Sequence, residues 1–285
     1  MPLNNAIPRP EHPKPQFERK DWINLNGKWT YAFDFGKSGY ERGFKDSRGF
    51  EGEIIVPFCP ESALSGIGHK DFIERMWYQR EINIPKSWKG RRTVLHFGAV
   101  DYVAEVFIDG RYAGRHFGGS SSFSFDVSDL VFPGKAHSLV VHVADDTRQG
   151  RQPCGKQSFH YKSAGCHYTR TTGIWQTVWL ESVREYSLKS CRIVPDLDGE
   201  KFVFTPLFRA LKGGLKLRIS VKDGAKTVDA REFSAQNGIP VQLDVKGAKA
   251  WSPENPFLYD ILFEVLDGGM IVDTVRSYAG MRKVH

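Results

Sequence analysis

The sequence of 285 residues has few cysteines, no long apolar run and no basic or apolar leader at its N-terminus. Its four cysteines are Cys59, Cys154, Cys166 and Cys191, and none is paired in a C-x-x-C spacing. This absence argues against a zinc site, so we expect free, mostly buried thiols and neither a metal nor a cofactor. No apolar stretch approaches the ~20 residues that a membrane helix needs. Without a visible signal peptide we expect a cytoplasmic protein, with export behind a trimmed signal as the open alternative.

The sequence also lacks a basic stripe, although its formal net charge is +7. A nucleic-acid-binding protein concentrates Lys and Arg on one face or in one motif. Here the basic residues are scattered, and groups such as residues 89–92 lie beside glycines that favour turns. We therefore expect a solvated surface, with neither a nucleic acid nor a membrane as partner.

Helical periodicity is missing as well, and a period of two replaces it. In residues 29–35, Trp29, Tyr31, Phe33 and Phe35 alternate with small or polar residues, which is typical of a half-buried strand. Asp109-Gly110 is a strong signal for a hairpin turn. Further alternating segments are expected at residues 53–57, 77–84, 94–97, 102–108, 121–127, 139–143 and 174–180. The first part of the chain is therefore predicted to be all-β.

After about residue 185 the strands become shorter and more evenly spaced. Leu215, Leu217, Ile219 and Val221 alternate with polar and charged residues, and Asp267-Gly268-Gly269 is expected to close a hairpin. About seven short strands in about 100 residues fit an immunoglobulin-like β-sandwich. We therefore expect two domains, over residues 1–185 and 186–285.

The alternation stops between residues 145 and 172. This segment is polar, is punctuated by glycines, and is long for a connection without secondary structure. Loops of this kind are often functional, so it is the first place to look for a site.

Short strings along the chain resemble the glycoside hydrolases of family 2, which include β-galactosidases, β-glucuronidases and β-mannosidases. They occur in that family's order and cover nearly the whole chain. The strings are LNGKW (25–29), VPFCPES (56–62), WYQR (77–80), HFGAVDY (96–102), GIWQTVWLE (173–181), WSPENPFLY (251–259) and GMRKV (280–284). The resemblance, closest to the β-galactosidase-like branch, implies a jelly-roll sugar-binding domain, then an immunoglobulin-like sandwich, then a catalytic TIM barrel expected after residue 285.

The resemblance also implies where the chemistry lies. Retaining glycoside hydrolysis uses two carboxyl groups about 5–5.5 Å apart. The family carries them on barrel strands, with the acid/base following an Asn, and no Asn-Glu dipeptide occurs here. We therefore expect the parent protein to be a retaining β-glycosidase, most closely a β-galactosidase. The present chain is expected to be an inactive scaffold and active-site rim without catalytic residues.

The polar segment holds the residues that the resemblance assigns to sugar contact. They match a family loop that reaches over the barrel mouth, with one more residue on the loop at 57–62: Lys156, Gln157, His167, Tyr168 and Arg170, together with Glu61. Amide, guanidinium and imidazole groups suit hydroxyl recognition, and a Tyr ring can face a sugar. The alternative is that these residues pack the loop or the interface with the barrel. The family's sugar-contacting acid has no clear counterpart, since His167 stands about where it would fall.

Other interpretations remain for the whole chain. It could be an autonomous carbohydrate-binding protein that uses exposed aromatic residues, or a structural pair of sandwiches. Trp29, Trp77, Trp175 and Trp179 lie on alternating strands, which favours a core position for all four. The expected partners are a carbohydrate substrate and a barrel in the same polypeptide. Self-association is also expected, because the face that the barrel would cover is exposed.

Overall fold

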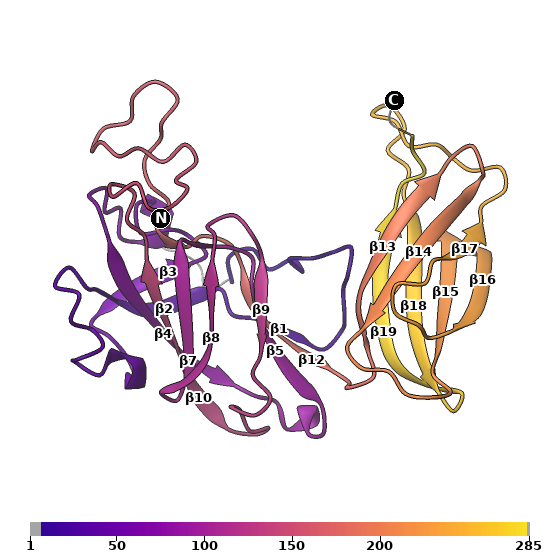
Figure 1. Cartoon of the computed structure of the whole chain (residues 1–285), viewed down its shortest axis with the longest axis horizontal. Helices are drawn as coiled ribbons and strands as arrows, with labels where there is room; N and C mark the ends of the chain where they lie inside the picture. The colour runs from indigo at the N-terminus through magenta and orange to yellow at the C-terminus, as the bar shows by residue number, and fades with distance from the viewer. Residues whose placement is uncertain (1–6, 284–285) are drawn as a thin grey trace. The chain divides into compact units, whose positions relative to one another are not determined.

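The computed structural model describes residues 7–283, and the chain divides into two compact units (Figure 1). The first comprises the N-terminal residues up to Pro13 and Trp22–Ser182, and the second comprises Lys14–Asp21 and the chain from Val183 onward. Within the described residues there is no α-helix, only strands and three short 3-10 turns at Phe44–Asp46, Ala63–Ser65 and Lys86–Trp88. The all-β prediction is therefore confirmed, as is its order of a jelly roll followed by an immunoglobulin-like sandwich.

The first unit contains a four-stranded sheet in the order β1-β12-β5-β9 and a six-stranded sheet in the order β3-β2-β4-β10-β7-β8. A third, two-stranded sheet pairs β11 with β6. The strands are β1 (Trp22–Asn24), β2 (Gly27–Phe33), β3 (Gly52–Val56), β4 (Arg75–Asn83), β5 (Arg92–Phe97), β6 (Val100–Asp101), β7 (Val103–Ile108), β8 (Arg111–Phe117), β9 (Phe123–Asp126), β10 (Ala136–Ala144), β11 (Gly173–Ile174) and β12 (Val178–Val183).

The core of the first unit draws side chains from both large sheets. Trp29, Tyr78 and Leu139 of the six-stranded sheet cluster with Phe97 and Leu180 of the four-stranded sheet, and all are almost completely buried. This is the arrangement that period-two strands produce, because alternate side chains of each strand point to the same face.

The six-stranded sheet is also covered on its outer face. The indole of Trp77 forms a second cluster with Phe107 and Val140, against which Phe44 and Phe50 pack from the connection between β2 and β3. The Trp77 indole nitrogen donates to the Asp34 carboxylate at 3.1 Å. Strand β4 is therefore buried on both faces, which explains the unbroken apolar run at Met76, Trp77 and Tyr78.

The second unit is a sandwich of a three-stranded sheet, β13-β14-β17, and a four-stranded sheet, β16-β15-β18-β19. Phe202 and Phe204 from the first sheet meet Ile219 and Phe263 from the second in its core. The strands are β13 (Leu188–Asp196), β14 (Lys201–Phe208), β15 (Lys216–Asp223), β16 (Lys226–Ser234), β17 (Val241–Asp244), β18 (Tyr259–Asp267) and β19 (Met270–Ala279).

The segment Lys14–Asp21 completes the edge of this second unit, which the sequence did not indicate. Glu18 and Arg276 of β19 exchange two backbone hydrogen bonds of 2.9 Å each. The adjacent Arg19 is 4% exposed, and its guanidinium makes a bidentate pair with the Asp273 carboxylate at 2.8 and 2.9 Å. The same carboxylate accepts from the backbone N–H of Leu188 at 2.9 Å, and Arg19 also donates to the Leu188 carbonyl. One buried ion pair therefore fastens the segment to both β13 and β19.

Two expectations about side-chain position need correction. Trp29, Trp77 and Trp179 are buried as expected, but Trp175 is only half-buried, because it lies in the connection between β11 and β12 rather than on a strand. The four free thiols are also less buried than expected. Cys166 is exposed and the other three are half-buried; of these, Cys191 packs against the core of the second unit.

Replacing Arg19 tests the ion pair that fastens the N-terminal segment. We expect Arg19→Met to destabilise the second unit by about 3–5 kcal/mol, because the Asp273 carboxylate would be left buried without its partner. The measurement is the urea midpoint of unfolding followed by circular dichroism. The matched control is Arg276→Gln on the neighbouring exposed surface, expected to change stability by less than about 0.5 kcal/mol. Equal midpoints for the two variants would contradict the assignment.

Candidate functional site

The connection between β10 and β11, residues 145–172, extends beyond the strand ends of the first unit (Figure 1). It is nevertheless structured. Ser158 donates its backbone N–H to the Tyr168 carbonyl and Tyr168 donates to the Lys156 carbonyl, both at 2.7 Å. Nearer the tip, His167 donates to the Ala164 carbonyl at 3.0 Å. These bonds fold residues 156–168 back on themselves, and we call residues 145–172 the rim loop.

Arg170 fixes the rim loop from the inside. Its side chain is 97% buried (3% exposed), and its guanidinium donates to the carbonyls of Ser158 at 3.1 Å and His160 at 2.7 Å. It also donates to the Lys70 carbonyl and lies 4.2 Å from the Phe72 ring centroid. Because its terminal nitrogens are occupied by backbone oxygens, Arg170 acts as an anchor of the loop in this structure.

Three carboxyl groups lie beneath the rim loop and receive its hydrogen bonds. Asp145 accepts from the Gln152 amide at 2.7 Å and the Thr172 hydroxyl at 3.2 Å. Glu61, 5% exposed, accepts from the backbone N–H of Thr172 through both oxygens at 3.2 Å. Asp101 accepts from the Gln157 amide at 2.8 Å. We call Asp101, Asp145 and Glu61 the carboxyl seat.

The environment of the carboxyl seat disfavours ionisation. Burial, together with the charge of Asp145, raises the pKa of Asp101 to about 7. Burial also raises the pKa of Asp145 to about 6, although the Gln152 and Thr172 hydrogen bonds oppose the shift. The pKa of Glu61 is raised by burial as well. Loss of hydration is the largest cause of the raised pKa of all three carboxyls, and repulsion from a neighbouring acid adds to it at Asp101 and at Asp145.

The outer face of the rim loop has a different character. Phe159, Tyr161 and Tyr168 are 51%, 58% and 60% exposed. The Lys156 ammonium lies 5.9 Å from the Tyr168 ring centroid, and the His167 ring lies edge-on to Phe159 at 5.7 Å. Residues 147–172 contain no Asp or Glu; their basic residues are Arg148, Arg151, Lys156, Lys162 and Arg170, with His160 and His167 in addition. Arg170 is buried and Arg148 pairs with Glu74 at 2.8 Å, so the loop presents Arg151, Lys156 and Lys162 outward together with the aromatic rings.

A pocket of about 630 Å³ opens between the rim loop and the turn after β8. It is lined by Asp101, Tyr102, Gly118, Gly119, Ser120, Ser121, Pro153, Cys154, Gly155, Lys156, Gln157, Thr171 and Trp175. The Trp175 indole is held in place by donating to the Gly119 carbonyl at 2.8 Å. Small-molecule sites commonly have volumes of about 300–1,000 Å³, so the pocket is large enough for a ligand.

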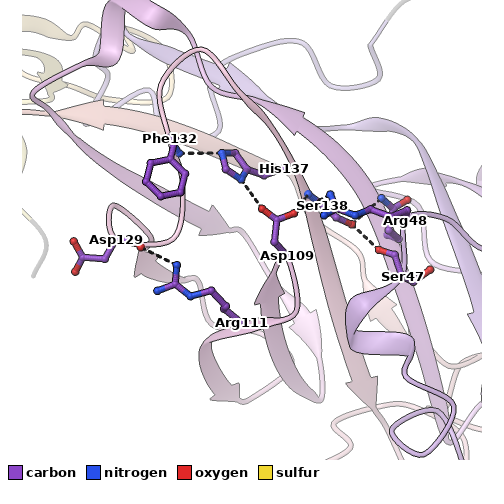
Figure 2. A network of polar contacts seen from close by, with 9 residues as sticks. Ser47, Arg48, Asp109, Arg111, Asp129, Phe132, His137 and Ser138 are labelled. Carbon is purple, nitrogen blue, oxygen red and sulfur yellow. Dashed lines mark hydrogen bonds and ion pairs between the residues drawn. The ribbon is translucent and has the colours of Figure 1, made fainter.

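A separate polar network resembles a catalytic triad but cannot act as one (Figure 2). The His137 ring contacts the Asp109 carboxylate at 2.6 Å through Nδ1, while its Nε2 accepts from the backbone N–H of Phe132 at 2.9 Å. The Ser138 hydroxyl donates to the Ser47 carbonyl at 2.7 Å. Since the imidazole has no nitrogen left for Ser138, the network stabilises the Asp109-Gly110 hairpin and activates no nucleophile.

Residues 7–283 contain no group of three or more His, Cys, Asp or Glu side chains able to hold a metal ion. The same residues include no helix long and apolar enough to cross a bilayer.

The structure brings the residues selected from the sequence together, but on two sides of the rim loop. Lys156, His167 and Tyr168 are on its outer part, whereas Arg170 and Glu61 lie inside it. Gln157 joins the two by accepting from the Thr171 N–H at 2.7 Å and donating to Asp101. Sequence reasoning favoured a hydrogen-bonded structural role for Asp101, in agreement with its bond from Gln157, but it did not show that Asp101 and Asp145 lie together under the rim loop or that Trp175 lines a pocket. The acidic pair at residues 145–146 was the one available signal, and it could not reveal which distant side chains would meet it.

Replacing Arg170 tests the anchoring of the rim loop. We expect Arg170→Ala to increase amide hydrogen exchange at Ser158 and Tyr168 by about tenfold or more, because the buried carbonyls lose their donors. Exchange followed by NMR or mass spectrometry is the measurement. The exposed Arg151 provides the control, and Arg151→Ala is expected to leave exchange unchanged. If both variants exchange like the unmodified chain, Arg170 does not hold the loop.

The raised pKa values predict a stability that depends on pH. The pKa of aspartate in an unfolded chain is about 3.9. The contribution of the neutral carboxyls to the stability of the folded state is therefore complete below about pH 4. This stabilisation is lost as the pH rises through about 6 and about 7, the pKa values of Asp145 and Asp101 in the folded chain. We expect Asp101→Asn and Asp145→Asn to raise the melting temperature of the first unit by roughly 2–6 °C at pH 8, with little change at pH 4.

Thermal unfolding at the two pH values measures this effect. The exposed Asp129 serves as the control, and Asp129→Asn is expected to have no pH-dependent effect. Variants of the carboxyl seat that melt at the same temperature as the unmodified chain at pH 8 would contradict the interpretation.

Comparison with known proteins agrees with this architecture. The family model described as "Glycosyl hydrolases family 2, sugar binding domain" matches residues 69–180, and "Glycosyl hydrolases family 2" matches residues 207–282. A β-galactosidase of Thermoanaerobacter pseudethanolicus is 23% identical over 93% of this chain and 36% of its own length. A β-glucuronidase of Bacteroides fragilis is 27% identical over 94% of this chain and 38% of its own length.

A solved structure shows the same fold. The β-glucuronidase of Ruminococcus gnavus superposes with a TM-score of 0.78 at 21% identity, covering 94% of this chain and 46% of that one. The chain thus spans less than half the length of these relatives. The two matched models follow one another in the order of the two observed units. The chain therefore belongs to the glycoside hydrolases of family 2 and comprises that family's non-catalytic sugar-binding and immunoglobulin-like domains.

Proposed function

We propose that this chain is the scaffold and active-site rim of a retaining β-glycosidase whose catalytic barrel follows it in the full-length protein. The observation that carries the proposal is the match of two consecutive family domains in a chain that spans 36–38% of relatives named β-galactosidase and β-glucuronidase. The carboxyl seat does not replace a barrel, because its side chains are buried beneath the rim loop and hydrogen-bonded to it. A retaining mechanism needs two carboxyls that both reach one sugar.

In this proposal the rim loop contacts the terminal sugar. Lys156, Gln157, His167 and Tyr168 supply ammonium, amide, imidazole and ring surfaces that suit hydroxyl groups and the apolar face of a sugar. Arg170 and Glu61 support these groups from inside, since the terminal nitrogens of Arg170 and the carboxylate of Glu61 are bonded to backbone groups. We expect a terminal β-linked sugar as substrate, with β-galactosides as the first candidate from the resemblance.

The charge of the rim loop favours a second candidate, a β-glucuronide. Residues 147–172 carry basic side chains and no carboxylate, and His167 occupies the position where the resemblance leads one to expect an acid. An outward-facing group of positive charges attracts a uronate carboxylate and gives no such advantage to a neutral galactoside. The proposal therefore includes a preference for β-glucuronides over β-galactosides, which can be measured.

Hydrolysis by a longer protein tests the proposal. A protein that contains this chain and the barrel encoded after it is expected to hydrolyse 4-nitrophenyl β-D-galactopyranoside or β-D-glucuronide with retention, followed by NMR of the first-formed anomer. The 285-residue chain alone is expected to hydrolyse neither. A reading frame that ends after residue 285, or a longer protein inactive on both substrates, would overturn the proposal.

Charge reversal on the rim loop separates the two substrates. Lys162→Glu is expected to lower kcat/KM for the glucuronide relative to the galactoside by about 3–10-fold in the longer protein, because an attractive charge becomes repulsive. Lys89, exposed but far from the rim loop in the sequence, supplies the control Lys89→Glu, for which the ratio should not change. An unchanged ratio in both variants would leave the galactoside as the candidate.

A further inference from the structure

The connection between β2 and β3, residues 34–51, lies on the outer face of the six-stranded sheet, and we call it the cover segment. Its first residue, Asp34, is buried and accepts from the Trp77 indole and from the backbone N–H groups of Ser38 and Gly39, at 2.9 and 3.0 Å. A Cβ atom on Gly39 would lie 2.3 Å from the Trp77 indole nitrogen. The cover segment is therefore packed directly against the indole.

A row of polar and aromatic side chains crosses this face beneath the cover segment. The strand register places Trp77 of β4, His142 of β10, Glu105 of β7 and Arg115 of β8 opposite one another in turn. Tyr40 of the cover segment lies on the row, with its ring centroid 4.9 Å from that of Trp77 and 5.2 Å from that of His142. Its hydroxyl donates to the Glu105 carboxylate at 2.5 Å. We call Tyr40, Glu105 and His142 the cover latch.

His142 has one ring nitrogen in a hydrogen bond and one without a partner. It is 4% exposed, and its Nδ1 lies 2.9 Å from the Glu105 oxygen that also accepts from Tyr40. Since a carboxylate can only accept, Nδ1 carries the proton of the neutral ring. The Nε2 atom is buried without a hydrogen-bond partner among residues 7–283. A second proton on Nε2 would therefore create a buried charge and a buried donor without an acceptor, which is costly.

Charged and titratable groups face the imidazole from each element around it. They are Asp34 and Tyr40 of the cover segment, Arg75 of β4, Glu105 of β7 and Arg115 of β8. Burial lowers the pKa of His142, and the hydrogen bond and charge of Glu105 oppose this effect without reversing it. Burial acts to raise the pKa of Glu105 and of Asp34, but the hydrogen bonds that each accepts outweigh it and lower both. The closed arrangement is therefore favoured near neutral pH and disfavoured in acid by all three groups.

We propose that the cover latch is an acid-sensitive switch, in which protonation of His142 releases Tyr40 and the cover segment from the outer face of the six-stranded sheet. A charged imidazole is more stable in water than in its buried position, so opening is coupled to proton uptake. Opening exposes Trp77 and Phe107, against which the cover segment packs. The switch requires neither a barrel nor a substrate, so it holds or fails independently of the glycosidase activity proposed above.

Hydrogen exchange of the full 285-residue chain tests the switch. The reporters are the amides of Gly39 and Phe44, which donate to the Asp34 carboxylate and to the Gly39 carbonyl within the cover segment. We expect their protection factors to fall by about fivefold or more between pH 7 and pH 5, because a hydrated imidazole has a pKa of about 6.5. The amide of Val141, in the core of the sheet, should stay at least about 100-fold better protected at both pH values, which distinguishes local opening from global unfolding.

Replacing the histidine isolates its titration. His142→Gln keeps a donor for Glu105 but cannot be charged, so the fall in protection between pH 7 and pH 5 should shrink to less than about twofold. His160→Gln, on the exposed part of the rim loop, is the matched control and should keep the full fall. Circular dichroism verifies that each variant is folded.

Tyr40→Phe keeps the test decisive if His142→Gln does not fold, because it removes one hydroxyl from a side chain that is 40% exposed. The reporter amides should then lose protection by about threefold or more already at pH 7. Equal protection of these amides at pH 7 and pH 5 in the unmodified chain would overturn the proposal. So would a fall that His142→Gln leaves unchanged, or unaltered protection in Tyr40→Phe at pH 7.

Discussion

Carboxyl groups that are removed from water need hydrogen bonds, and for the carboxyl seat those bonds come from the rim loop. Asp145 depends on Gln152 and Thr172, and Asp101 depends on Gln157. If residues 152–172 lifted away, both acids would lose these donors, although Asp101 would stay on β6 and Asp145 directly after β10. The carboxyl seat therefore keeps the rim loop in one conformation, although the loop has no regular secondary structure. The shapes of the loop and of the pocket beside it both depend on these hydrogen bonds.

The charge of the loop and the charge beneath it have opposite signs. No acid occurs in residues 147–172, and a further carboxylate there would add repulsion to a group of acids whose pKa values are already raised. Arg170 is the one arginine of the loop that is buried. Its charge opposes the rise in the pKa of Asp145, but burial is the larger effect and the pKa stays raised. The remaining basic side chains lie outward. The lack of acids in residues 147–172 therefore both avoids further repulsion of the carboxyl seat and makes the outer surface of the loop basic. A preference for an anionic sugar would follow from this arrangement without any residue selected for it alone.

Local patterns predicted the sheets well because strand formation depends on alternation over a few residues. Trp29, Trp77 and Trp179 were correctly predicted to be buried for that reason. Trp175 comes directly after a strand of only two residues, so the alternation did not predict its position. Contacts between distant segments could not be predicted in this way. Nothing near Arg19 indicates that it would pair with Asp273, and nothing near Arg170 indicates that its donors would go to backbone carbonyls. The resemblance directed attention to the rim loop, but separating its outer groups from its anchors required the geometry.

The acids of the carboxyl seat differ in how they are bound. Both oxygens of Asp145 accept hydrogen bonds, one from Gln152 and one from Thr172. Asp101 accepts from Gln157 through Oδ2, and its Oδ1 is buried without a donor among the described residues. Gln157 in turn accepts from the Thr171 N–H, so the single bond to Asp101 connects the end of β6 to a side chain that the loop already holds in place. A hydrogen bond between two groups that are both fixed costs little additional conformational entropy, so one donor is enough to couple the loop to β6.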